Sequence, residues 1–253
     1  MDLTARTVFI AGGTSGIGLE LGRRFAAAGS AVILGGRRGD VLAGLAGEGF
    51  GVVEIDVTDA GGVRRASEEV LARYPGLDTL VTMSGVMLTE DLRDPGHFEA
   101  AERTVDTNLL GTIRVIDAFT GHLVSRGGGA IVTVTSGIAF LPFPLMATYA
   151  ASKAGVHAYS EALRAQLAGT GVEVTELVPP AVATTPEIAE ANPRALGLTE
   201  FADEVMDLLG TNPTPHEILV ERVLTHRWAE RNGTYAELVA QRSQPLATLP
   251  GRS

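Results

Sequence analysis

Short, continuously apolar runs alternate along the chain with longer segments in which apolar residues recur every three or four positions. The short runs predict strands that are buried on both faces, and the longer segments predict amphipathic helices. The predicted strands cover residues 7–11, 31–34, 51–55, 77–82, 130–135, 172–178 and 218–220. The predicted helices cover residues 16–28, 59–73, 102–123, 148–167 and 201–209.

This alternation is typical of a parallel sheet with helices on both faces. We therefore expect an α/β fold, with residues 1–253 forming a single-domain, Rossmann-like, doubly wound sheet. Two segments are less regular. Residues 180–198 predict a loop with some helix, and residues 180–210 together are expected to cover the substrate at the carboxyl edge of the sheet. Residues 241–253 are expected to be a loose tail.

Composition narrows the possible partners. The 253 residues are 45% hydrophobic and 20% charged, which suits a globular domain with a sizeable core. The formal net charge is −10 and no run of Lys or Arg occurs, so nucleic acid and membrane surfaces, which need a basic face, are not expected partners.

Composition also narrows the chemistry and the compartment. The absence of Cys excludes disulfides, thiolate nucleophiles and Cys-ligated zinc, and the five His residues show no metal-ligand spacing. No metal is therefore expected. The start of the chain is polar, and no apolar run approaches about 18 residues, so we expect a soluble, cytoplasmic protein.

A glycine-rich segment, AGGTSGIG at residues 11–18, follows the first predicted strand and precedes the first predicted helix. Gly12 allows a tight turn, Gly16 allows the backbone to approach a pyrophosphate, and Gly18 allows the helix to pack closely on the sheet. The N-terminus of that helix offers unpaired N–H groups to phosphate oxygens. The position of the segment favours a dinucleotide site over a glycine-rich turn without a ligand.

The end of the second strand indicates which dinucleotide binds. A site selective for NAD usually has a carboxylate there, which binds the ribose 2′-hydroxyl and repels a 2′-phosphate. Here the sequence is Gly35-Gly36-Arg37-Arg38, and two guanidinium groups suit a phosphate. A solvated Arg pair is the alternative. We expect NADP(H) to be favoured over NAD(H), with Asp56 accepting a hydrogen bond from the adenine amino group.

The strongest chemical signal is a Tyr and a Lys four residues apart, Tyr149 and Lys153, on one face at the start of a predicted helix. A phenol with an ordinary pKa of about 10 is a poor acid–base catalyst at neutral pH, and a nearby ammonium group lowers that pKa. Ser136 ends the fifth predicted strand, at the carboxyl edge where such sheets bind ligands. This spacing alone usually means two surface residues, but with the glycine turn and Ser136 it predicts a catalytic set.

With these motifs in this order, the chain resembles the short-chain dehydrogenase/reductase family over nearly its whole length. The matching stretches are residues 12–18, Asp56-Val57, Asn108-Leu109-Leu110-Gly111, Ser136, 149–153 and 179–184. Four further stretches, residues 136–142, 164–167, 179–182 and 227–231, are similar to the oxidoreductases encoded beside teichoic-acid D-alanylation genes. The family resemblance implies an oxidoreductase that interconverts a carbonyl and an alcohol.

The resemblance also implies a role for each matching residue. Tyr149 would be the general acid and base, Lys153 would lower its pKa and bind the nicotinamide ribose, and Ser136 would position the carbonyl. Asn108 would bend the long helix and hold a water molecule of a proton relay. Pro179, Val182 and Thr184 would flank the nicotinamide carboxamide. Together with the residues above, the expected cofactor contacts are Gly12, Thr14, Ser15, Gly16, Ile17, Gly18, Arg37, Arg38, Asp56, Val57, Ser84, Gly85, Asn108, Tyr149, Lys153, Pro179, Val182 and Thr184.

Three positions depart from the family's usual pattern. Ala11 replaces a Thr, Pro180 replaces a Gly, and Thr82-Met83-Ser84-Gly85 replaces Asn-Asn-Ala-Gly after the fourth strand. The family's Asn side chains tie the sheet to neighbouring backbone, so the third departure predicts weaker cofactor binding or altered chemistry. Thr82 keeps a hydroxyl, and Gly85 keeps the close approach.

Two other functions remain open beside an NADP(H)-dependent ketoreductase or alcohol dehydrogenase. One is a nucleotide-binding sensor or scaffold without turnover, and the other is dehydration or isomerisation on the same fold. Between Ser136 and Tyr149 lie five large apolar residues, Phe140, Leu141, Phe143, Leu145 and Met146. They either line the substrate pocket or pack under the covering region. If they line the pocket, they favour an apolar or aromatic carbonyl compound as the substrate. The family resemblance implies a homodimer or homotetramer.

Overall fold

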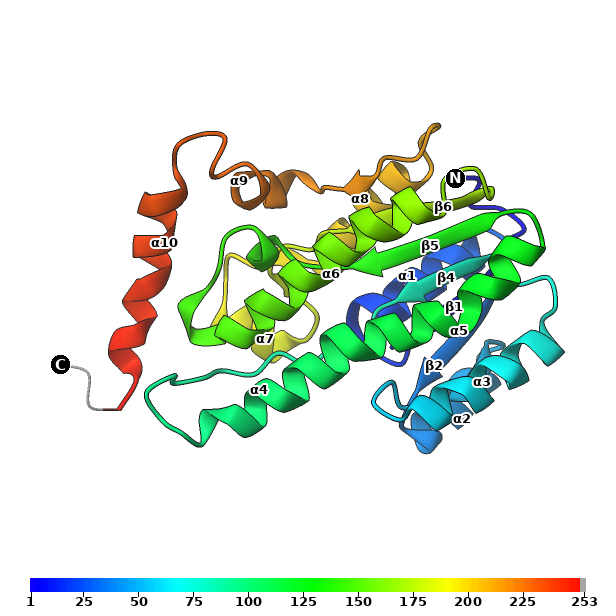
Figure 1. Ribbon diagram of the computed structural model, residues 1–253, viewed down its shortest axis with the longest axis horizontal. Helices are drawn as coiled ribbons and strands as arrows, with labels where there is room; N and C mark the ends of the chain where they lie inside the picture. The colour runs from blue at the N-terminus through cyan, green and yellow to red at the C-terminus, as the bar shows by residue number, and fades with distance from the viewer. Residues whose placement is uncertain (251–253) are drawn as a thin grey trace.

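The computed structural model describes residues 1–250, which are built around a parallel sheet of seven strands (Figure 1). The strand order is β3-β2-β1-β4-β5-β6-β9. The strands are β1 (Thr7–Ala11), β2 (Ala31–Gly36), β3 (Gly51–Glu54), β4 (Thr79–Thr82), β5 (Gly129–Val134), β6 (Val172–Leu177) and β9 (Glu217–Ile218). Every neighbouring pair is parallel, which confirms the predicted doubly wound α/β fold.

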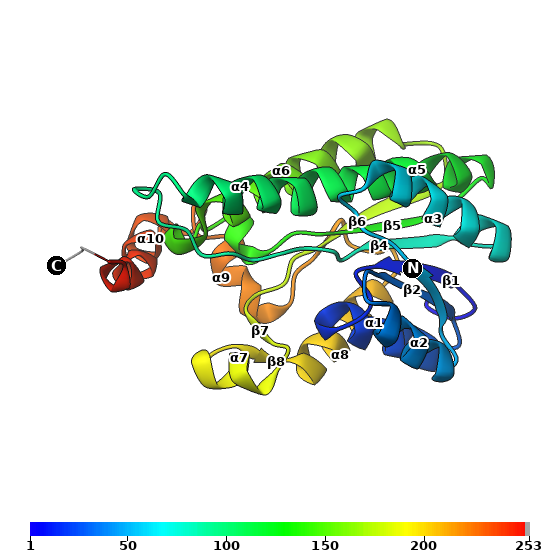
Figure 2. The same ribbon diagram turned by 90° about the horizontal axis from the view of Figure 1, so that it is seen from below.

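Helices cover both faces of the sheet (Figure 2). One face carries α1 (Gly16–Ala27), α2 (Gly39–Gly47) and α8 (Leu198–Leu209), and the other carries α3 (Ala60–Arg73), α5 (Gly111–Ser125) and α6 (Ala147–Gln166). Phe25 and Phe201 are buried in the core on the first face. Phe9 and Phe119 are buried on the second, with ring centroids 5.0 Å apart. Because helices cover both faces, the central strands are apolar without alternation.

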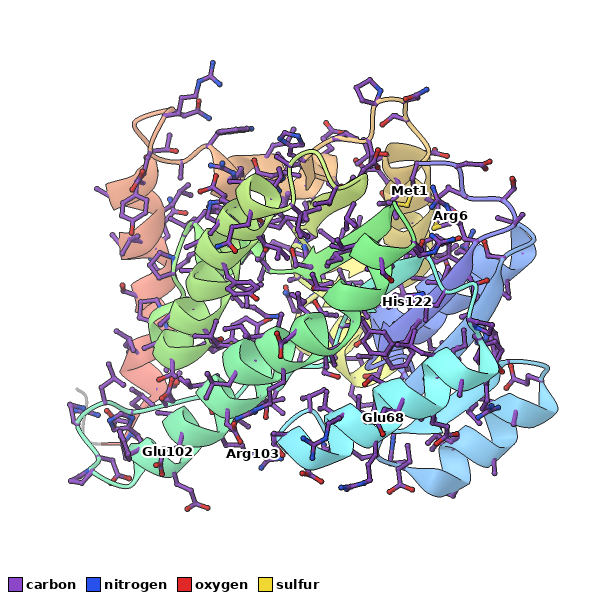
Figure 3. The ribbon with its side chains drawn as sticks, turned by 45° about the vertical axis from the view of Figure 1, so that its right-hand side comes forward. Met1, Arg6, Glu68, Glu102, Arg103 and His122 are labelled. Carbon is purple, nitrogen blue, oxygen red and sulfur yellow. The ribbon has the colours of Figure 1, made fainter. Side chains whose placement is uncertain are left out.

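The helix predicted over 102–123 is longer and contains a change of pitch. It starts as α4 (His97–Val105), passes through a π-helical turn (Asp106–Leu110) and continues as α5. Its start shows the helical pattern of burial, since Ala101 and Thr104 are buried while Glu102 and Arg103 are exposed (Figure 3). Asn108 lies in the π turn and is fully buried.

The sequence analysis missed α2. Three of its nine residues are glycine, which lowers helix propensity and obscures the helical period. Leu42 and Leu45 are nevertheless buried, and this packing holds the helix in place. β2 also continues two residues beyond its predicted end, through Gly35 and Gly36, because these residues still pair with β1 and β3.

The irregular segment after β6 contains a small parallel sheet and a short helix. These are β7 (Val182–Ala183), α7 (Pro186–Ala191) and β8 (Leu196–Gly197), which agrees with the expected loop with some helix. α8 follows directly and begins at Leu198, three residues before its predicted start at Phe201.

The C-terminal segment is helical where a loose tail was expected. After α9 (Leu224–Arg227), α10 (Tyr235–Ser243) leads into a 3-10 helix (Gln244–Thr248). The guanidinium of Arg242 donates to the carbonyl oxygen of Leu141 at 2.9 Å, which ties α10 to the segment after β5. Such a contact between distant segments gives no signal in the local sequence. Residues 251–253, also part of the predicted tail, lie outside the described residues.

Among residues 1–250, no helix has the length and apolar character needed to cross a membrane.

Candidate active site

The glycine-rich turn between β1 and α1 packs against the backbone that follows β4. Gly12 has a φ of +93°, and a Cβ there would lie 2.5 Å from the Ser84 nitrogen, so only glycine fits. A Cβ at Gly18 would lie 2.3 Å from the Gly12 carbonyl oxygen. A Cβ at Gly16 would lie 3.5 Å from the Thr184 side chain. The turn, the start of α1 and the segment after β6 therefore meet at the carboxyl edge of the sheet.

Three charged residues, Arg37, Arg38 and Asp56, were expected at the adenine-ribose end of the site. Arg38 and Asp56 make hydrogen bonds to neighbouring residues there. Arg38 Nη2 donates to the carbonyl oxygen of Thr14 at 3.4 Å and to its Oγ1 at 3.3 Å. Asp56 Oδ1 accepts from the nitrogen of Thr58 at 3.0 Å and from its Oγ1 at 2.8 Å. Burial raises the pKa of Asp56, but these hydrogen bonds and the charge of Arg37 outweigh it, so the pKa lies below its ordinary value. Both Arg side chains are exposed.

Ser136, Tyr149 and Lys153 come together where β5 ends and α6 begins. Ser136 Oγ accepts from the Ile138 nitrogen at 3.3 Å and lies 3.5 Å from the carbonyl oxygen of Pro179. Tyr149 is half-buried in the first turn of α6, and Lys153 Nζ lies 5.8 Å from the centroid of its ring. The Lys153 ammonium is buried and donates to the carbonyl oxygen of Val134 at 2.8 Å.

The pKa of Tyr149 is raised, whereas the sequence analysis expected Lys153 to lower it. Burial raises the pKa of Tyr149 above its ordinary value of 10.0, and the hydroxyl of Ser136 opposes this change. The Lys153 ammonium donates to the end of β5, and no effect of its charge on the pKa of Tyr149 is resolved. Burial also lowers the pKa of Lys153 from 10.5 to about 8, although the charge of Glu176 opposes this. In the free protein the environment of both groups thus favours their neutral forms.

Asn108 ties the segment after β4 to the helix that carries Tyr149. Its Oδ1 accepts from the Val86 nitrogen at 2.8 Å, and its Nδ2 donates to the Val86 carbonyl oxygen at 2.9 Å. Nδ2 also lies 3.3 Å from Ser152 Oγ, which donates to the carbonyl oxygen of Tyr149 at 2.8 Å. A Cβ on Gly85 would lie 3.3 Å from Asn108 Oδ1 and 3.9 Å from Lys153 Nζ. Gly85 therefore lies beside the predicted catalytic groups.

Glu90 is a buried carboxylate at this site that sequence reasoning missed. Its Oε2 accepts from the Thr148 nitrogen and its Oε1 from Thr148 Oγ1, both at 2.7 Å. His97 Nδ1 lies 3.4 Å from the same Oε1. Glu90 thus caps the first turn of α6 directly beside Tyr149. It lies in the irregular segment between β4 and α4, where neither periodicity nor motif spacing gives a signal.

The remaining expected cofactor contacts lie at different depths. Val182 and Val57 are buried, and a Cβ at Gly111 would lie 2.7 Å from Val57 Cγ2, so Val57 packs toward α5. Ile17 is half-buried against the first core, and Ser15 is the N-cap residue of α1.

A family model described as short chain dehydrogenase matches residues 6–194. The chain belongs to this family. It is therefore an oxidoreductase of a family that uses NAD(P)H.

Relatives and solved structures agree with this membership. The chain is 36% identical over 188 residues to the uncharacterized oxidoreductase DltE of Bacillus subtilis, which covers 73% of this chain and 74% of the relative. This match confirms the narrower resemblance. The chain is also 36% identical over 178 residues to a sulfoacetaldehyde reductase of Chromohalobacter salexigens, covering 68% of this chain and 70% of the relative. A short chain dehydrogenase from Burkholderia cenocepacia, solved in complex with NADP, superposes with a TM-score of 0.81 at 27% identity, covering 94% of this chain and 99% of the other.

Thr82 does not make the side-chain hydrogen bond to neighbouring backbone that Asn makes at this position in the usual family pattern. Its Oγ1 is buried and has no hydrogen-bond partner among residues 1–250. The neighbouring contact between strands is made by the backbone instead, where the Met83 nitrogen donates to the Ala11 carbonyl oxygen at 2.8 Å. The close fit of Gly12 against Ser84 supplies the rest of the junction.

A hollow of about 530 Å³ lies apart from the predicted catalytic groups. Its lining includes Phe140, Phe143, Ala150, Arg227 and Tyr235, and it does not include Ser136, Tyr149 or Lys153. The Phe140 ring stacks edge-on against His157 and under the guanidinium of Arg227. Leu141 is fully buried. The structure thus places Phe140 and Phe143 on this hollow, and Leu141 in the interior.

Proposed function

We propose that the protein interconverts a carbonyl and an alcohol, with NADP(H) favoured over NAD(H) as the hydride carrier. The observation that supports this most is the convergence of Ser136, Tyr149 and Lys153 beside Gly85. They lie at the same edge of the sheet as the glycine-rich turn, so one bound dinucleotide would reach both.

The residues divide the work of reduction in a simple way. Bound NADPH would supply hydride to the carbonyl carbon. Ser136 Oγ would hold the carbonyl oxygen, and Tyr149 would transfer its phenolic proton to that oxygen as negative charge develops on it. The raised pKa of Tyr149 keeps the phenol protonated at neutral pH, which is the form that reduction needs. Lys153, in its ammonium form, would stabilise the phenolate left behind and bind the nicotinamide ribose.

The preference for NADP(H) rests on Arg37 and Arg38. Both are exposed just beyond β2, and Arg38 already contacts Thr14 of the glycine-rich turn. A 2′-phosphate between the turn and β2 would meet two positive charges and no carboxylate from residues 35–38. The NADP complex of the Burkholderia relative supports this assignment.

For the substrate we propose an apolar or aromatic carbonyl compound, covered by residues 180–210. Leu145 and Met146 support an apolar wall, because both are half-buried immediately before α6. The name of the sulfoacetaldehyde reductase relative supports reduction of an aldehyde or a similar carbonyl group.

We also propose that the protein assembles as a homodimer or homotetramer through α5 and α6. Exposed small residues on α6, Ala151, Ala154 and Ala158, would allow two helices to approach closely. Leu110 and Val124 are exposed large apolar side chains on the neighbouring helix.

NADPH oxidation in the presence of a panel of aldehydes and ketones tests this function. The proposal predicts turnover of at least one apolar or aromatic carbonyl compound, and the reverse reaction with the matching alcohol and NADP⁺. NADPH binding without turnover of any carbonyl compound would contradict it and favour a sensor.

A further inference from the structure

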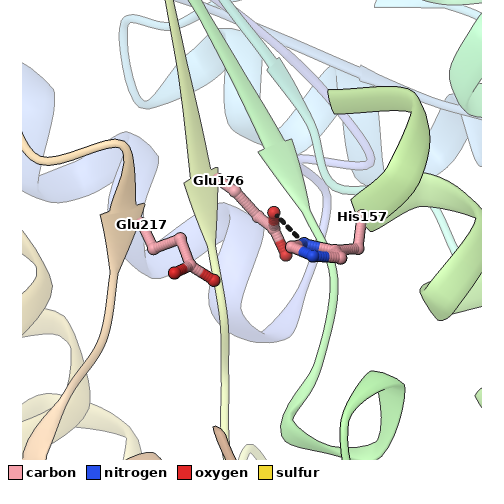
Figure 4. Close-up of side chains that lie close together, drawn as sticks. All are labelled: His157, Glu176 and Glu217. Carbon is pink, nitrogen blue, oxygen red and sulfur yellow. Dashed lines mark hydrogen bonds and ion pairs between the residues drawn. The ribbon is translucent and has the colours of Figure 1, made fainter. Parts of the chain in front are cut away.

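Glu176 and His157 form an acid–base pair on the segments next to the proposed catalytic residues. Figure 4 shows this pair together with Glu217. Glu176 of β6 is fully buried, and its Oε2 lies 2.7 Å from His157 Nδ1. Its Oε1 accepts from Thr135 Oγ1 at 2.6 Å. Thr135 directly precedes Ser136, and His157 follows Lys153 by one turn of α6. The pair therefore contacts both segments that carry the proposed catalytic groups.

The other two carboxylates near this pair are more exposed than Glu176. Glu217 of β9 is the register partner of Glu176, and it receives both Nε and Nη2 of Arg227, at 2.7 and 3.1 Å. Glu161 is largely exposed and lies 4.0 Å from His157 Nε2. The hydrogen bond from Glu176 raises the pKa of His157, and the partial burial of the ring opposes this. Of these three carboxylates, only Glu176 is buried, and its charged partner is His157.

Lys153 needs a counter-charge, and no carboxylate among residues 1–250 is in direct contact with its ammonium group. Its ammonium is buried and donates to a neutral carbonyl oxygen, that of Val134. A buried cation without a nearby anion loses its proton readily. Glu176 Oε1 accepts from Thr135, the residue that follows Val134, so the Glu176 carboxylate lies beside the segment to which Lys153 donates. At that position its negative charge favours the ammonium form of Lys153.

We propose that Glu176 is a positioning residue that serves as the buried counter-charge of Lys153, and that His157 tunes its strength. This inference rests on the proposed role of Lys153 in catalysis. While His157 is protonated, it offsets part of the carboxylate charge, and when it loses its proton the full charge of Glu176 acts on Lys153. The pair would thereby keep Lys153 an ammonium, and so able to stabilise the phenolate of Tyr149, to higher pH than its burial alone permits.

The chain offers a direct way to test this, because Lys153 is its only lysine. Protein labelled with ¹³C at the lysine ε-carbon gives a single side-chain lysine signal, which can be titrated by NMR. We expect a midpoint near pH 8 in the unliganded wild-type protein. Glu176→Gln should move that midpoint down by roughly half a pH unit or more, since one nearby opposite charge is lost. A midpoint that stays or rises would overturn the proposal.

Glu217→Gln is the matched control. It removes the same charge from the neighbouring strand, where Arg227 already engages it, so it should leave the Lys153 midpoint in place. A shift as large as that of Glu176→Gln would show that no specific counter-charge exists.

His157→Gln decides the question if Glu176→Gln does not fold. The variant keeps the carboxylate, so the Lys153 midpoint should stay at its wild-type value, or rise by the amount that any charge on His157 had offset. A lower midpoint would overturn the proposal. The titration uses the protein without substrate or cofactor, so its result does not depend on turnover and is separate from the test of the proposed function.

Discussion

The phosphate end and the catalytic end of the proposed site consist of different kinds of groups. The end that would hold the cofactor phosphates is made of backbone and exposed charge, with Gly12 and Gly18 in close contacts and Arg37 and Arg38 in solvent. The catalytic end is made of buried polar side chains that hydrogen bond across distant segments. Its buried members include Glu90, Asn108, Ser136, Lys153 and Glu176.

This difference separates what each end controls. The phosphate end depends on the local conformation of a few residues, so changes there should alter cofactor binding and the fold around the turn. At the catalytic end, burial shifts the pKa values of Tyr149 and Lys153, so changes there should alter proton transfer. Each prediction below tests one side of this separation.

The largest effect is expected for Tyr149→Phe, which removes the proton donor and keeps the ring. Turnover should fall by at least ~10²-fold, and NADPH affinity should barely change, because in the proposed mechanism the hydroxyl acts on the substrate and not on the cofactor. Steady-state kinetics and a fluorescence titration of NADPH check both values. Tyr159→Phe, a half-buried Tyr later in the same helix, is the control and should keep its turnover. A Tyr149→Phe enzyme with near-normal turnover would remove the catalytic role.

Arg37→Ala should weaken NADPH binding by about 1.5–3 kcal/mol, roughly 10- to 100-fold, through loss of a charge-assisted contact. NADH binding should hardly change, because it lacks the 2′-phosphate. Calorimetric titration of both dinucleotides measures the difference. Arg65→Ala, an exposed Arg on α3, should affect neither. Equal losses of NADH and NADPH affinity, or tighter binding of NADH by the wild type, would contradict the assignment.

Gly12→Ala should lower the free energy of unfolding by about 1–3 kcal/mol, because the new Cβ meets the Ser84 backbone at a positive φ. Denaturant unfolding checks this value. Gly44→Ala is the matched control, since it lies in α2 with open space around it and should be neutral or slightly stabilising. A neutral Gly12→Ala would show that the turn is not fixed by backbone contact.

Glu90→Ala should have the smallest effect, a loss of about 0.5–2 kcal/mol in the free energy of unfolding, the usual cost of losing an N-cap. Turnover should fall as well, because Glu90 caps the turn that holds Tyr149. Thermal unfolding and kinetics measure both. Glu99→Ala, an exposed Glu on α4, should change neither. If stability falls and turnover stays normal, the cap does not position Tyr149.

The sequence predicted the parts of the molecule that local patterns encode. The seven strands, the glycine-rich turn and the meeting of Ser136 with Tyr149 and Lys153 follow from apolar runs and from motif spacing. α2 was missed because its glycines hide the helical period, and only burial of Leu42 and Leu45 reveals it.

Contacts between distant segments were beyond prediction. Glu90 reaches Thr148, and Glu176 reaches His157, across separations that leave no trace in the local pattern. The same limit explains the pKa of Tyr149. The spacing of Tyr149 and Lys153 suggested that the ammonium lowers this pKa, but burial of the phenol raises it, against the opposing hydrogen bond with Ser136.

In the proposed reaction, hydride goes from NADPH to a carbonyl carbon while Tyr149 supplies the proton. The most direct measurement uses NADPH deuterated at the transferable position of its nicotinamide ring, with a panel of carbonyl compounds, and analyses the products by mass spectrometry. The account predicts an alcohol that carries deuterium on the former carbonyl carbon, formed at least ~10²-fold more slowly by Tyr149→Phe. NADPH binding without a deuterated alcohol from any compound, or equal labelling by the variant, would contradict it.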